Sequence, residues 1–305
     1  GSSIGLLGTG SVNISGTTAL GADPTSRGVL IEGPLTSVIG SAVNIGGDTV
    51  DLRAPILATT GNVDVMGAAI TLGSSGNNLA APVGVISLNG PVTLASGTQV
   101  QALNTSFVST LAGNSQNLDV SGSVTFFADS TNLGGLSATG NIATQNVLLQ
   151  VATPLIVKTG AQAVFTGTVD AEVIGESGSD ISTAGDLIIG ANAPNGFRTN
   201  GSVRTGPSTI TILDSDGAQL GGQTIVGDRG SLVSASGFIL TPGGALTGSG
   251  TVTGAVTAGP FSTVSPGFSP GILTTDSITF QPVSTFVAEI NSIFPGPNHD
   301  RLVAN

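Results

Sequence analysis

Few residues of this chain are able to carry acid–base chemistry. His299 is its single histidine and is followed directly by Asp300 and Arg301. An imidazole beside a carboxylate is an arrangement suited to general-base catalysis. The triplet, however, follows the sequence PGPN at 295–298, which favours a turn. We interpret His299 as a turn residue and predict no catalytic residue.

Acids recur in two short pairs, Asp170-x-Glu172 and Asp214-x-Asp216, each expected to lie on one strand face. Clustered carboxylates are the machinery of glycoside hydrolysis, so a carbohydrate-active enzyme, either a lyase or a hydrolase, is an alternative. Residues that would hold a sugar are scarce, because Lys158 is the one lysine and there is neither tryptophan nor tyrosine. The leading prediction is therefore a protein without enzymatic activity.

Ligands for a metal or a cofactor are also few. The sequence Asp214-Ser215-Asp216-Gly217 is similar to the start of a calcium loop, but no suitably spaced glutamate follows it. The glycine pairs at 221–222 and 243–244 are not followed by the Gly-Lys-Ser/Thr of a phosphate loop. We predict no metal site, no cofactor-binding site and no cofactor.

Composition limits the partners of the chain. The 305 residues contain 18 acids and seven bases, for a net charge of −11, and the bases are scattered from Arg27 to Arg301. A phosphate-binding surface needs clustered Lys and Arg, so nucleic acid is not expected as a partner. No run of about 20 apolar residues is present, so no membrane-spanning helix is expected. The chain has no initiator methionine, and we expect a processed chain or an excised segment.

The elements that position these residues should be strands. Apolar residues make up 39% of the chain; they are mostly Val, Ile, Leu and Ala, interleaved with Thr and Ser and interrupted by Gly, which is typical of strands and turns. Cysteine is absent, so disulfides contribute nothing. The sequence predicts an all-β fold with a buried core.

Internal repetition indicates how these strands are arranged. The segment VNIGGDTVDL at 43–52 is followed twenty residues later by VDVMGAAITL at 63–72, with apolar residues and a glycine at matching places. A shorter unit, glycine followed by x-Val/Leu-Thr, recurs at 32–37, 89–94, 121–126 and 249–254. Repeats of this size predict a right-handed parallel β-helix, a β-solenoid with about 20 residues per coil.

Antiparallel sandwiches and up-and-down barrels also consist of many short strands, but they do not explain similarity at an offset of twenty residues. Stacked coils do, because inward side chains of successive coils form one hydrophobic column. About fifteen coils spaced roughly 4.8 Å apart would give a rod of about 70 Å. We predict a single elongated β-solenoid over residues 1–305.

The segment from Leu246 to Ala258 alternates without interruption, with small or apolar residues on one side and mainly threonine and serine on the other. Two Pro-Gly turns follow, at 266–267 and 270–271, and a strand from Ile272 to Phe280 is expected after them. Small inward residues predict a narrow coil whose corners are formed by glycine.

These residues resemble the autotransporter-associated β-strand repeat, also called the passenger-associated transport repeat. The matching residues are Gly243-Gly244, Leu246, Gly248, Gly250-Thr251-Val252, Gly254, Val256, Val264, Pro266-Gly267, Ser269-Pro270-Gly271, Leu273-Thr274, Glu289-Ile290, Asp300 and Leu302-Val303. Within the single solenoid, we therefore expect autotransporter-type coils over 241–305. Residues 1–240 are expected to form irregular coils, which resemble the repeats of large bacterial adhesins of the filamentous haemagglutinin type.

The resemblance implies an exported, extended β-helix that is displayed on the cell surface or shed from it. We therefore expect an extracellular structural protein, the shaft or subunit of a surface fibre, adhesin or matrix filament. Its expected partners are further copies that associate through the solenoid ends, together with cell-surface or matrix components. A receptor-binding adhesin is a further alternative, and the segment 190–208 is the one candidate for a long binding loop.

Overall fold

A computed structural model describes residues 4–7, 12–16, 28–31, 34–38, 42–73, 78–190, 196–213, 215–267, 270–290 and 299–305. The described residues form strands and no helix, and parallel strands stack in a β-solenoid of about 12 turns with about 20 residues per turn. The predicted fold class is confirmed. The turns are fewer than the fifteen expected, because several coils are longer than twenty residues: Val12 pairs with Val43, and Val173 pairs with Phe197.

The chain divides into two compact units, Gly1–Thr153 (unit 1) and Pro154–Asn305 (unit 2). Residue 240, the predicted boundary between two kinds of coil, lies inside unit 2, away from this boundary. The expected division at residue 240 stays a prediction.

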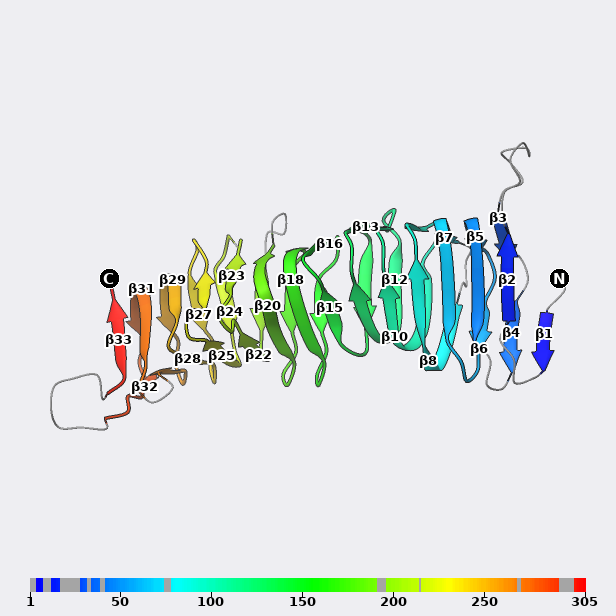
Figure 1. Cartoon of the computed structure of the whole chain (residues 1–305). Helices are drawn as coiled ribbons and strands as arrows, with labels where there is room; N and C mark the ends of the chain where they lie inside the picture. The colour runs from blue at the N-terminus through cyan, green and yellow to red at the C-terminus, as the bar shows by residue number, and fades with distance from the viewer. Residues whose placement is uncertain are drawn as a thin grey trace. The chain divides into compact units, whose positions relative to one another are not determined.

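Unit 1 contains sixteen of the described strands, which form three parallel sheets (Figure 1). In chain order these strands are β1 (Ile4–Leu7), β2 (Val12–Gly16), β3 (Gly28–Ile31), β4 (Leu35–Val38), β5 (Val43–Leu52), β6 (Ile56–Ala58), β7 (Val63–Leu72), β8 (Asn78–Asn89), β9 (Val92–Leu94), β10 (Thr98–Phe107), β11 (Leu111–Ala112), β12 (Asn117–Phe126), β13 (Ser130–Leu133), β14 (Gly135–Ala138), β15 (Ile142–Thr144) and β16 (Val147–Val151).

Long strands bend at a corner and so belong to two sheets. Sheet A contains β1, β4, β6, β14 and the first halves of β8, β10 and β12. Sheet B contains β2, β15, the first halves of β5 and β7, and the second halves of β8, β10 and β12. Sheet C contains β3, β9, β11, β13, β16 and the second halves of β5 and β7.

The repeat at 43–52 and 63–72 is one coil lying on the next. β5 and β7 pair in parallel with Val43 opposite Val63, Gly47 opposite Gly67 and Leu52 opposite Leu72. The apolar members are buried in both strands, whereas Asn44 and Asp64 face outward and are only partly covered. The predicted register is confirmed residue by residue.

The core of unit 1 consists of columns of inward side chains that run from coil to coil. Phe107 of β10 pairs with Phe126 of β12, and their rings stack with centroids 5.3 Å apart and planes 10° from parallel. Leu88 precedes them in the same column, and all three side chains are fully buried. Inward side chains of this size contribute about 1.5–3 kcal/mol each through burial.

Unit 2 contains the remaining described strands and also forms three parallel sheets. The strands are β17 (Leu155–Val157), β18 (Gln162–Asp170), β19 (Val173–Gly175), β20 (Asp180–Ile189), β21 (Phe197–Thr199), β22 (Ser202–Arg204), β23 (Thr209–Ile212), β24 (Ala218–Leu220), β25 (Gln223–Val226), β26 (Ser231–Val233), β27 (Phe238–Leu240), β28 (Ala245–Gly248), β29 (Thr251–Ala258), β30 (Thr263–Pro266), β31 (Ile272–Phe280), β32 (Thr285–Phe286) and β33 (Arg301–Ala304).

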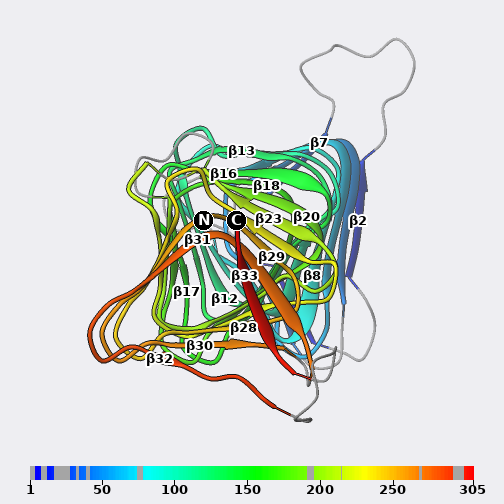
Figure 2. The same ribbon diagram turned by 90° about the vertical axis from the view of Figure 1, so that its left-hand side faces the viewer.

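Sheet D contains β17, β19, β21, β24, β27 and the second halves of β29 and β31. Sheet E contains the first halves of β18 and β20, then β22, β25, β28, β30 and β32. Sheet F contains the second halves of β18 and β20, then β23, β26, the first halves of β29 and β31, and β33. In Figure 2, β28, β30 and β32 lie together on one side of the coil, and β29, β31 and β33 on another.

The alternating segment from Leu246 to Ala258 spans two strands, β28 and β29. Its inward side is buried as predicted, including Leu246, Val252, Val256 and Ala258. Gly248 has a φ of +121°, and a Cβ atom there would lie 2.0 Å from the carbonyl oxygen of Val226 on the preceding coil. A residue without a side chain is therefore required where the coil bends so close to its neighbour.

Candidate functional site

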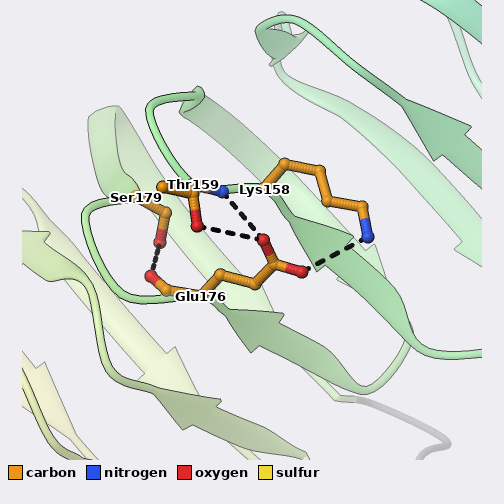
Figure 3. A network of polar contacts seen from close by, with 4 residues as sticks. All are labelled: Lys158, Thr159, Glu176 and Ser179. Atoms are coloured by element: carbon orange, nitrogen blue, oxygen red, sulfur yellow. Dashed lines mark hydrogen bonds and ion pairs between the residues drawn. The ribbon is translucent and has the colours of Figure 1, made fainter.

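A cluster of polar groups joins two neighbouring coils of unit 2; we call it the charge cluster (Lys158, Thr159, Glu176 and Ser179; Figure 3). The carboxylate of Glu176 accepts hydrogen bonds from the backbone N–H of Thr159 at 2.9 Å and from its hydroxyl at 3.2 Å. Nζ of Lys158 donates to the other carboxylate oxygen at 3.3 Å. Ser179 donates its hydroxyl hydrogen to the backbone carbonyl of Glu176 at 2.7 Å.

These contacts lower the pKa of the Glu176 carboxyl group. The largest contribution is the hydrogen bond from the Thr159 backbone, followed by that from Lys158, and both favour the ionised form. The carboxylate is therefore more firmly charged than an ordinary glutamate. A carboxylate in this state is a poor proton donor near neutral pH, so the geometry favours a structural role.

Two further ion pairs link successive coils in the same unit. Arg198 donates to the carboxylate of Glu172, and Nε of Arg204 lies 3.1 Å from Oδ1 of Asp180. Such half-exposed pairs stabilise a fold only slightly. Each pair does fix which residue of one coil lies near which residue of the next. We therefore infer that the pairs help to set the register between coils.

The structure describes the surroundings of three of the four sequence-predicted acids. Asp170 is buried at the end of β18, whereas Glu172 is held by Arg198. Asp214 lies outside the described residues, and Asp216 is exposed beside the hydroxyl of Ser215. Among the described residues, no three His, Cys, Asp or Glu side chains gather as a metal site would require.

The residues of the triplet at 299–301 take part in backbone pairing and hydrogen bonding. His299 forms an antiparallel bridge with Ile290. Asp300 accepts the backbone N–H of Gly271 on one carboxylate oxygen and that of Glu289 on the other, each at 2.9 Å. Asp300 thus fastens two distant segments of the coil, a role that its place in the repeat pattern did not reveal.

Two short strands interrupt the segment 190–208, which was expected as the candidate binding loop. β21 and β22 occupy 197–199 and 202–204, and both pair with neighbouring coils. Residues 191–195 lie outside the described residues. The expectation of one long loop was therefore wrong for the strands at 197–204, because their Gly-rich flanks are coil corners.

One coil of unit 2 has strand edges that lack a partner among the residues that the structure describes. It is formed by β31 and β32, and we call it the open coil (residues 272–290). In sheet F, β33 pairs with the first half of β31. In the described part of the chain, the second half of β31 and the whole of β32 have a paired strand on one side only. Within the described residues, two of the three sheets thus present an open edge here.

Two columns of inward side chains, buried in the preceding coil, end at the open coil in exposed residues. In sheet D, Ala258 is fully buried and its partner Phe280 is 41% exposed. In sheet E, Val264 is fully buried and its partner Phe286 is 46% exposed. The two phenylalanine rings lie edge to face with centroids 6.0 Å apart. Val283, Val287 and Ile290 of the same coil are also exposed, so the open coil displays several apolar side chains.

No protein-family model, curated protein or solved structure matches this chain. None of the described residues forms a helix able to span a membrane.

Proposed function

We propose that the chain is a non-enzymatic structural β-solenoid, the shaft or subunit of an exported surface fibre, whose coils continue by association with a second copy. The observation that carries the proposal is the open coil. Positions that are buried in the preceding coils end there on exposed phenylalanines. They lie next to strand edges whose backbone donors and acceptors have no strand partner among the described residues.

The partner is a second copy because the interaction required already exists within the chain. Every coil of unit 2 offers a parallel edge and inward apolar residues to the next coil, and the open coil offers the same chemistry. In unit 1, β1 and β2 also pair on one side only among the described residues. Two complementary parallel edges favour a head-to-tail contact, which can repeat without closing.

The energetics indicate weak association. Covering the exposed parts of Phe280, Val283, Phe286, Val287 and Ile290 contributes roughly 6 kcal/mol. The loss of translational and rotational freedom costs about 4–15 kcal/mol, and the new backbone hydrogen bonds offset only part of it. Association should therefore require micromolar concentrations or higher.

Location outside the cell is supported by the resemblance of residues 243–303 to autotransporter repeats. The carbohydrate-active enzyme alternative draws no support from Asp170 and Glu172, because the first is buried and the second is held by Arg198.

Sedimentation velocity over a wide concentration range tests the proposal. The chain should form larger species as its concentration rises, and the double variant Phe280→Asp with Phe286→Asp should remain monomeric. Phe127→Asp is the matched control, because Phe127 of unit 1 is 43% exposed but does not lie on an open edge. A wild-type chain that stays monomeric, or a double variant that associates like the wild type, would refute the role of the open coil.

A further inference from the structure

The outer face of sheet A in unit 1 carries an open groove of about 640 Å³. Its polar lining consists of Gln99, Gln101, Asp119, Ser121 and Ser137, and Leu57 forms part of its apolar floor. All five polar residues are exposed. The groove is remote from the charge cluster in sequence and plays no part in the proposed association.

The parallel register arranges these side chains in two rows that cross the strands. One row consists of Gln99, Asp119 and Ser137, which lie opposite one another on β10, β12 and β14. The second row consists of Leu57, Ala80, Gln101 and Ser121 on β6, β8, β10 and β12. The short side chain of Ala80 lies between two longer ones, which leaves the face hollow.

The polar groups of the groove are unused within the part of the chain that the structure describes. None of the five side chains makes a hydrogen bond or an ion pair with the described residues. Outward polar residues of sheet B behave differently: Asn104 donates to Ser106 at 3.0 Å, and Thr125 donates to Asn104 at 3.4 Å. The acids of the charge cluster and its neighbouring pairs are likewise engaged, whereas Asp119 is not.

The charge of the groove selects the class of ligand. Asp119 is its one charged lining residue and no base lines it, so anionic polymers are repelled. Carboxamides, a carboxylate and hydroxyls together offer both donors and acceptors at short intervals, as a polyhydroxylated ligand requires. Because the rows cross five strands spaced roughly 4.8 Å apart, the ligand must extend over about 19 Å.

We propose that this groove binds a neutral oligosaccharide in an extended conformation, with Gln99, Gln101 and Asp119 as its principal hydrogen-bonding residues. Glycoside hydrolysis uses two carboxyl groups, and Asp119 is the single acid of the groove, so the site binds and does not cleave. No aromatic ring lines the groove, so affinity rests on hydrogen bonds and falls near the millimolar range.

Nuclear magnetic resonance of the full chain labelled with ¹⁵N-glutamine tests this proposal. The probes are the hexasaccharides of cellulose, amylose, mannan and chitin, with hexagalacturonic acid as the anionic comparison. We expect at least one neutral probe, and not the anionic one, to shift the side-chain amide signals of Gln99 and Gln101. The double variant Gln99→Ala with Gln101→Ala should bind that probe roughly 20-fold more weakly, about fivefold for each hydrogen bond lost.

Gln223→Ala is the control, because Gln223 is an exposed glutamine on β25 in unit 2, and it should bind as the wild type does. Circular dichroism would verify that all variants are folded. The proposal is overturned if no neutral probe shifts these signals at tens of millimolar, or if the double variant binds unchanged. Shifts that depend on protein concentration alone would place a second copy in the groove and would also overturn it.

Discussion

Buried threonines of unit 2 differ in whether their hydroxyl groups have partners. Thr205 and Thr224 are both fully buried. The hydroxyl of Thr205 donates to the carbonyl of Gly206 at 3.0 Å and accepts the N–H of Gly227 at 3.1 Å. The hydroxyl of Thr224 has no partner among the described residues, although it lies in the apolar column below Leu246. Identical residue types should therefore respond oppositely to the same change.

We predict that Thr224→Val raises the free energy of unfolding by about 1 kcal/mol, because it removes an unsatisfied buried hydroxyl. Thr205→Val should lower it by about 1–3 kcal/mol, because it leaves the Gly227 donor without an acceptor. Urea unfolding of the two variants checks both signs. If both variants were destabilised equally, the hydroxyl of Thr224 would have a partner in solution.

Glycines with positive φ also fall into two kinds. Gly248 faces the Val226 carbonyl at a distance that excludes a Cβ atom, whereas a Cβ atom on Gly243, with φ +85°, would meet nothing within 4 Å. Replacing either residue by alanine imposes backbone strain, but only Gly248→Ala also forces two coils apart.

We expect Gly243→Ala to lower the free energy of unfolding by about 1 kcal/mol and Gly248→Ala to lower it by at least about 3 kcal/mol. The comparison of urea midpoints isolates the contribution of the close approach, since strain is common to both. Equal losses would show that backbone strain alone explains the need for glycine at this corner.

At the scale of single residues, residue type predicted which positions face inward and where the coil turns. Alternation predicted the inward positions from Leu246 to Ala258, and glycine predicted the corners. Whether a buried threonine is satisfied could not be predicted, because its partner is a backbone group on another coil or turn whose position depends on coil length.

At the scale of elements, register is maintained by inward columns and by polar links between coils. The twenty-residue repeat predicted the pairing of β5 with β7 correctly. Pairing in unit 2 was less predictable: Leu155 pairs with Val173 and Val173 pairs with Phe197, because corners absorb insertions without disturbing the strands. The links from Glu172, Glu176 and Asp180 to neighbouring coils follow from that register, and so were not foreseen.

The charge cluster gives a pH-dependent contribution to stability. Because hydrogen bonds lower the pKa of Glu176 in the folded chain, its contribution is complete above the ordinary glutamate pKa of about 4.3. It is lost as the pH falls through the lower, folded-state pKa. The difference in the free energy of unfolding between the wild type and Glu176→Gln should therefore become smaller as the pH falls below the ordinary glutamate pKa.

Carbon-13 NMR titration of the Glu176 carboxyl group measures the pKa directly. Lys158→Met should retain part of the lowering, because the Thr159 backbone donor is its largest single cause. A glutamate that titrates at its ordinary pKa in the wild type would contradict the hydrogen bonding described for this cluster.

At the scale of the whole molecule, the sequence predicted an all-β solenoid and the structure has one. The open coil could not be predicted in the same way. The alternation of Ile278 and Phe280 with Ser277 and Thr279 indicates that the first two share one face of the strand. A pattern within one strand does not reveal whether another coil covers that face. The exposure of Phe280 and Phe286 is a property of the stack. The groove on sheet A also depends on how the coils stack, because it forms from residues of five strands.

Electron microscopy with fibre diffraction of the concentrated chain tests the central claim most directly. If coils continue from one copy to the next, unbranched filaments should form, with a meridional reflection near 4.8 Å. The double variant Phe280→Asp with Phe286→Asp should form none under the same conditions. Dispersed single molecules at every concentration, or filaments that form equally well from the double variant, would contradict continuation through the open coil.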